Sequence, residues 1–159
     1  MSIAAIDAAK RVCDLSSWTV TNLQLQKLLY IIHMVYAGRH NGSILIREPF
    51  EAWDYGPVIP SLYKKVKIFG NKPISDIFTF AKDRLPAAKD AIIREACGNL
   101  LSITPAQLVS IAHWQEGAWA KNYAPRAFGI QIPQKDIFDE YNKRVESGNL
   151  RGAPYAAAE

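Results

Sequence analysis

The chain has 159 residues, of which 49% are hydrophobic and 21% charged, and its formal net charge at pH 7 is +4. This length and composition are typical of one globular domain with its own hydrophobic core, and they exclude an intrinsically disordered protein. The net charge is too small to require a nucleic acid or an acidic partner, although it permits either.

The cysteines and the apolar stretches indicate the cellular compartment of the protein. Cys13 and Cys97 occur singly, without a CxxC pair, which is typical of reduced thiols in a cytosolic protein. The N-terminus has no basic segment followed by an apolar run, and the longest apolar stretch, residues 28–36, is too short to span a bilayer. We therefore expect a cytoplasmic protein with no signal peptide and no membrane span.

Two helices are predicted at the start of the chain. Residues 3–14 place apolar side chains at helical spacing. Thr21 begins the second helix, because Thr21 and Gln24 have the spacing of a capping box, in which each side chain bonds to the backbone N–H of the other residue. The apolar stripe that follows ends near Gly38.

A small β element is predicted next. Residues 44–46 and 50–53 are short extended runs, and we expect them to form a hairpin. Residues 55–57 (Tyr-Gly-Pro) predict a turn, because glycine tolerates positive φ and proline fixes φ. Pro60 suits the first turn of a helix that extends to about Phe69.

The second half of the chain is predicted to be helical with irregular connections. The expected helices cover about residues 86–100, 104–114 and 134–146, with one helical turn at 119–123. We therefore predict a mainly α, single compact domain of about six to seven helices with a short hairpin near residues 44–54. This domain covers residues 1–148, and residues 149–159 are expected to form a flexible tail.

Catalytic and metal-binding patterns are weak in this sequence. Neither cysteine has the local signature of a nucleophile, and both are expected inside helices as small hydrophobic residues. His113 and Glu116 share one helix face, but two ligands are too few for a metal site. The glycines are scattered among turns and form no phosphate-binding loop. We predict that the chain is not an enzyme and binds no metal or other cofactor.

A nucleic-acid role is suggested by one basic run. Lys64, Lys65 and Lys67 lie close together in the predicted helix after Pro60. However, Leu62 and Val66 are spaced as the core face of that helix, so the lysines are more simply its solvated side. Nucleic acid is therefore not the favoured partner, although a nucleic-acid-binding regulatory protein remains an alternative.

Two motifs carry a resemblance to a known family. Residues 21–30 (TNLQLQKLLY) and 51–63 (EAWDYGPVIPSLY), with a looser third piece that holds His113 and Trp119, resemble the Panacea domain. This is the antitoxin domain of a SocA-like, phage-associated family of toxin–antitoxin systems. The resemblance covers about residues 4–145.

The resemblance implies an antitoxin that neutralises a protein toxin by direct binding, without catalysis. The toxin is expected to be encoded next to it. Some family members resemble proteolytic adaptors, so delivery of a toxin or other client to an ATP-dependent protease is an alternative. Tyrosine and tryptophan often carry binding hot spots, but they also fill cores. Candidate partner-binding residues are Asn22, Gln26, Lys27, Tyr30, Trp53, Tyr55, Tyr63, His113 and Trp119.

Overall fold

The structure is a computed structural model that describes residues 1–147, and it confirms a mainly α domain with one small β-hairpin. The predicted tail at residues 149–159 lies outside the described residues. The elements are α1 (Ala5–Leu15), α2 (Asn22–Arg39), β1 (Glu51–Trp53), β2 (Gly56–Val58), α3 (Pro60–Val66), the 3₁₀-helix η1 (Lys67–Phe69), α4 (Ala87–Leu100), α5 (Pro105–Ala112), α6 (Ala118–Asn122) and α7 (Gln134–Glu146). Within residues 1–147, no helix combines the length and the apolar character needed to cross a membrane.

Helix α2 begins where the sequence predicts it. The N–H of Gln24 donates to Thr21 Oγ1 at 3.3 Å, and the N–H of Thr21 donates to Gln24 Oε1 at 2.8 Å, so the capping box is confirmed. Helix α5 begins with the same pair of bonds between Thr104 and Gln107. Both helix starts are therefore set by residues only three positions apart.

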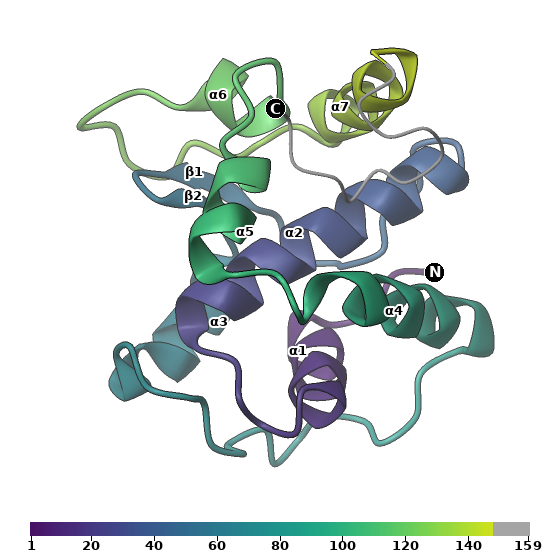
Figure 1. Cartoon of the computed structure of the whole chain (residues 1–159), viewed down its shortest axis with the longest axis vertical. Coiled ribbons are helices and arrows are strands. Elements are labelled where there is room, and N and C mark those ends of the chain that lie inside the picture. The colour runs from purple at the N-terminus through teal and green to yellow at the C-terminus, as the bar shows by residue number, and fades with distance from the viewer. Residues whose placement is uncertain (148–159) are drawn as a thin grey trace.

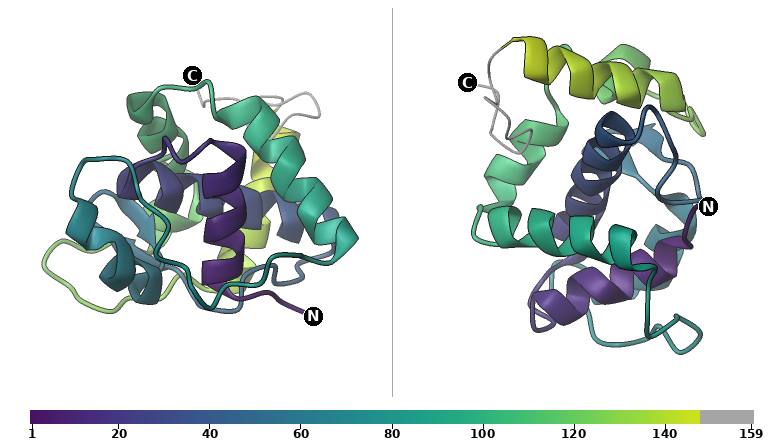
Figure 2. Two further views of the ribbon diagram at one scale, coloured as in Figure 1. Left: turned by 90° about the horizontal axis from the view of Figure 1, so that it is seen from below. Right: turned by 90° about the vertical axis from the view of Figure 1, so that its right-hand side faces the viewer.

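Helix α2 runs through the middle of the domain (Figures 1 and 2). It contacts α1 and α4 on one side and α7 on another, and β2 lies against its N-terminal half. The sequence predicted one apolar stripe, but burial extends around the helix because neighbours cover it from several directions. Even the polar residues Gln26, Lys27 and His33 are no more than 2% exposed.

Gly38 allows α7 to pack closely on α2. A Cβ added at Gly38 would overlap with the ring of Tyr141 on α7. We expect Gly38→Ala to displace this ring and to lower the free energy of unfolding by about 1–3 kcal/mol, despite the higher helix propensity of alanine. Urea unfolding would measure the change. Gly98→Ala on α4 is the matched control, because an added Cβ there meets no atom within 4 Å, and equal stability of the two variants would contradict the prediction.

The hairpin lies slightly later in the chain than the sequence suggests. Strands β1 and β2 are antiparallel, with Glu51 opposite Val58 and Trp53 opposite Gly56. The earlier run at residues 44–46 instead lies beside the N-terminus, where Ile3 and Ile46 form an isolated parallel bridge. Tertiary packing of the N-terminus, which the local pattern does not reveal, therefore decides the partner of this run.

His33 is a buried polar residue on α2 that contacts the backbone at Ile46 and the first residue of α7. Its Nδ1 accepts the N–H of Ile46 at 3.2 Å, and its Nε2 lies 2.9 Å from Gln134 Oε1. Nδ1 must be unprotonated to accept, so Nε2 carries the proton and the ring is neutral. A second proton on Nδ1 would point at the N–H of Ile46. This contact disfavours the doubly protonated ring. In addition, desolvation by burial lowers the pKa of His33 from 6.5 to about 4.

Acid should therefore destabilise the fold through His33. Between pH 6.5 and about 4 the unfolded chain binds more protons at this histidine than the folded chain does, so this contribution falls as the pH falls through that window. The loss at its lower end is on the order of 3 kcal/mol. Urea unfolding at pH 7 and pH 4 would measure it. The variant His33→Asn keeps an acceptor without titrating, and an equal loss in both proteins would contradict the prediction.

Candidate functional site

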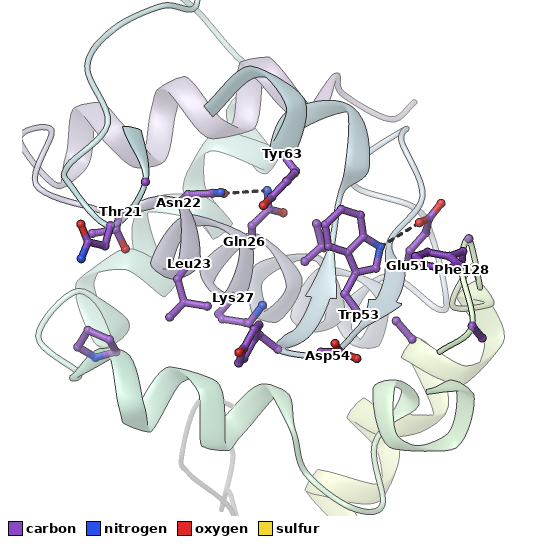
Figure 3. A pocket seen from close by; sticks show the side chains of 18 residues that line it. Thr21, Asn22, Leu23, Gln26, Lys27, Glu51, Trp53, Asp54, Tyr63 and Phe128 are labelled. Atoms are coloured by element: carbon purple, nitrogen blue, oxygen red, sulfur yellow. Dashed lines mark hydrogen bonds between the residues drawn. The ribbon is translucent and has the colours of Figure 1, made fainter. Parts of the chain in front are cut away.

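A groove of about 710 Å³ opens beside the N-terminal half of α2 (Figure 3). One wall comes from the start of α2, and the other comes from the hairpin and the loop at residues 127–129. Tyr63 of α3, the turn at residues 70–71 and Pro105 of α5 complete the lining. Both motifs that the sequence singled out, residues 21–30 and 51–63, thus contribute to one surface.

Exposed apolar side chains surround this groove. Leu23 is 39% exposed, Tyr55 is 74% exposed and Phe128 is 96% exposed, and all three belong to the lining. Phe128 lies in a turn where Arg126 and Gly129 both have positive φ. Large apolar side chains gathered around a concave site are typical of a surface that binds another molecule.

Asn22 and Gln26 connect α2 to the hairpin. Gln26 Oε1 accepts the N–H of Ile59 at 2.9 Å, directly after β2, and its Nε2 donates to Asn22 Oδ1 at 3.3 Å. Both residues line the groove but are buried. Their hydrogen bonds therefore position the hairpin against α2.

Trp53 and Tyr63 form the aromatic part of the groove wall. Their ring centroids lie 4.9 Å apart in an edge-to-face arrangement, and both residues are only partly buried. The indole N–H of Trp53 donates to Glu51 Oε1 at 3.0 Å, which is visible in Figure 3. This contact holds the Trp53 ring within the hairpin wall.

A stack of three rings supports the hairpin from the other side. His113 stacks on Trp119 at 4.0 Å between centroids, and Trp119 stacks on Tyr123 at 4.7 Å. The indole N–H of Trp119 donates to the carbonyl of Trp53 at 2.7 Å, and the Tyr123 hydroxyl donates to Asp54 Oδ1 at 2.6 Å. None of the three rings lines the groove, so they are placed to support its hairpin wall.

Lys27 and His113 converge on Gly56. Lys27 lines the groove although it is 1% exposed, and its ammonium donates to the carbonyl of Pro57 at 3.2 Å. A Cβ on Gly56 would lie 2.9 Å from Lys27 Cε and 3.1 Å from His113 Nε2, so only glycine fits between them. Gly56 also has a φ of +112°, which disfavours any other residue.

Burial controls the ionisation of both side chains. Desolvation lowers the pKa of Lys27 from 10.5 to about 7. The pKa of His113 is also lowered, mainly by desolvation and further by the charge of Lys27, although the backbone of Tyr55 opposes this change. His113 Nε2 is buried and makes no hydrogen bond among the described residues. The site thus holds polar groups whose hydrogen-bonding capacity is incompletely used.

Tyr30 is placed apart from the groove. It is 0% exposed, and its hydroxyl donates to Glu140 Oε1 at 2.6 Å in the core. We therefore do not carry Tyr30 into the proposed binding surface. Leu23, Pro105 and Phe128 line the groove but were not among the predicted partner-binding residues. For Phe128, a large apolar side chain within a turn segment was a signal in the sequence that could have indicated a binding role.

Other chemistry is sparse in the part of the chain that the structure describes. No group of three or more histidine, cysteine or acidic residues in residues 1–147 is placed to hold a metal ion. Burial raises the pKa of both Cys13 and Cys97 to about 12, so these thiols stay protonated near neutral pH. Lys64, Lys65 and Lys67 lie on the exposed side of α3 and η1, while Leu62 and Val66 face the core.

Fold and groove define the class of protein: a small helical domain with an apolar groove beside a β-hairpin. The chain belongs to the antitoxin SocA-like, Panacea domain family, whose sequence model matches residues 25–120. It is similar to Antitoxin SocA of Caulobacter vibrioides (strain NA1000 / CB15N), with 33% identity over 113 residues. The similarity covers 63% of this chain and 58% of that relative, so the chain spans little more than half the relative's length. No solved structure is significantly similar to the chain.

Proposed function

We propose that the chain is an antitoxin that neutralises a protein toxin, encoded next to it, by direct binding in the cytoplasm. The observation that carries this proposal is the apolar groove that joins the two family motifs in one surface. Membership in an antitoxin family supports the role, and the exposed side chains of Leu23, Tyr55 and Phe128 support the place of binding.

Neutralisation of this kind requires an interface and no reaction. A stable protein–protein interface buries about 1,600 Å² in total, and its binding energy comes mainly from a few aromatic and charged anchors. The groove offers Tyr55 and Phe128 as exposed aromatic anchors and Trp53 and Tyr63 as a half-buried aromatic wall. The partner's toxic site would be covered, or the toxin held in an inactive complex, without any catalytic group of this chain.

Expression of the neighbouring reading frame in a bacterial host, with and without this chain, tests the proposal. We expect the neighbour alone to stop growth, the pair to restore growth, and the two proteins to purify together. A toxic neighbour that this chain neither binds nor counteracts would remove the proposal, and so would a neighbour that is harmless on its own.

Direct blocking and proteolytic delivery are separated by the half-life of the toxin. For direct binding, we expect the toxin to persist at the same half-life when this chain is co-expressed, in an inactive complex. A toxin that is degraded faster in the presence of this chain, and only while an ATP-dependent protease is active, would instead support the adaptor alternative.

A further inference from the structure

The groove lining includes a buried lysine that has no counter-ion among the described residues. Lys27 is 1% exposed, and among residues 1–147 no carboxylate forms an ion pair with it. Its ammonium has three N–H donors, and the structure satisfies one of them, at the carbonyl of Pro57. Buried charges in proteins are normally paired, so an unpaired lysine in the wall of an open groove indicates that the pair is completed from outside.

A second polar group lies beside Lys27, outside the groove lining. His113 Nε2 is buried without a hydrogen-bond partner, and it meets the Lys27 side chain at Gly56. The stacked ring of Trp119 fixes the orientation of this imidazole. His113 does not line the groove, so Lys27 is the donor of this pair that a ligand in the groove can reach. A desolvated ammonium favours an anionic oxygen over a neutral one as its partner.

We propose that Lys27 forms the receptor for a carboxylate of the toxin, namely an aspartate or glutamate side chain that enters the groove between apolar neighbours. This inference rests on the proposed antitoxin function. It names the chemistry of the toxin segment that the groove binds: one acidic residue flanked by aliphatic or aromatic residues.

The shape and charge of the groove select this ligand over other anions. Glu51 and Asp54 also line the groove, and their carboxylates repel a nucleic acid or another polyanion more strongly than they repel a single carboxylate. The lining continues on both sides of Lys27, towards Leu23 on one side and towards Phe128 on the other (Figure 3). A toxin segment that crosses the whole groove can place a side-chain carboxylate at Lys27. A C-terminal carboxylate at Lys27 would leave the groove on one side of this lysine empty.

Four short peptides, added to the full chain, test the proposal. Acetyl-Phe-Glu-Leu-amide carries its only charge on the side chain, and acetyl-Phe-Gln-Leu-amide is its neutral match. Acetyl-Leu-Phe with a free terminal carboxylate and its amide form the second pair. Chemical shifts of the lysine ¹³Cε nuclei report binding, and the Lys27 signal is assigned by its absence in Lys27→Met.

We expect the Glu peptide to bind at least about tenfold more tightly than the Gln peptide, and to shift the Lys27 signal. Lys27→Met should abolish this preference, and Lys64→Met, at an exposed lysine outside the groove, should leave it unchanged. Equal affinities of the Glu and Gln peptides for the wild-type chain would overturn the proposal. A preference found only with the free terminal carboxylate would overturn the assignment to a side chain.

The two proposals fail in different ways. If the chain rescues growth but binds the Glu and Gln peptides equally, the carboxylate site is wrong and the antitoxin function stands. If the Glu preference depends on Lys27 but no neighbouring toxin is neutralised, the site stands and the antitoxin function is wrong.

Discussion

Replacing Arg144 with methionine is expected to lower the free energy of unfolding by about 3–5 kcal/mol. Arg144 and Glu140 are each 1% exposed, and Arg144 Nη2 lies 2.8 Å from Glu140 Oε2. The same carboxylate accepts the hydroxyl of Tyr30 and the N–H of Ala118. Without the guanidinium, a carboxylate charge stays buried with only neutral donors, which is strongly unfavourable.

Two controls separate this effect from a general loss of packing. Adding Glu140→Gln to Arg144→Met removes the buried charge but keeps an acceptor for Tyr30 and Ala118, so stability should largely recover. Lys135→Met breaks the exposed pair with Asp139 on the same helix and should change stability by less than about 1 kcal/mol. Urea unfolding measures all three variants. If Arg144→Met lowers the free energy of unfolding no more than Lys135→Met does, the prediction that the buried pair stabilises the fold is wrong.

The buried pair also connects α7 to the groove. Glu140 fixes the N-terminal turn of α6 by accepting the N–H of Ala118, and a Cβ on Gly117 would lie 2.8 Å from Glu140 Oε1. The next residue, Trp119, donates to the carbonyl of Trp53 in the hairpin. A substitution at Glu140 or Arg144 is therefore expected to displace α6 and, through Trp119, the hairpin wall of the groove.

Local patterns explain which parts of this fold could be predicted. The capping box at Thr21 and the last helix depend on residues three or four apart, and the structure confirms them. The pairing of residues 44–46 depends on the N-terminus, some 40 positions away, and no local signal carries it. The pair Glu140–Arg144 has the i, i+4 spacing of an ordinary surface ion pair, so its burial could not be predicted from sequence.

In the candidate site, too, some features follow from local sequence patterns and others depend on tertiary packing. The two motifs that resemble the family identify both walls of the groove, because their residues are contiguous in sequence. The burial of Lys27 depends on the hairpin covering a polar face of α2, which periodicity would leave in solvent. Phe128 reaches the groove only because residues 130–132 lie along the outer edge of β1, where Ile130 accepts the N–H of Ala52.

Removing the two exposed aromatic anchors is expected to abolish neutralisation without unfolding the chain. In Tyr55→Ala/Phe128→Ala, both side chains are lost from the margin of the groove, where they are 74% and 96% exposed. Aromatic hot spots commonly contribute about 2 kcal/mol or more each, so the affinity for the toxin should fall at least about 100-fold. Exposed side chains contribute little to folding, and the free energy of unfolding should change by less than about 0.5 kcal/mol for each site.

The matched control removes equally exposed apolar side chains that do not line the groove. Ile68 and Phe80 are 81% and 91% exposed, and Ile68→Ala/Phe80→Ala should bind the toxin and rescue growth as the wild-type chain does. Titration calorimetry on the purified pair gives the affinities, and the growth assay gives the consequence. The two pairs of side chains are similarly exposed, so exposure alone does not predict which pair binds the toxin. Loss of affinity in this control, with full rescue by Tyr55→Ala/Phe128→Ala, would therefore place the toxin interface at Ile68 and Phe80 and not at the groove.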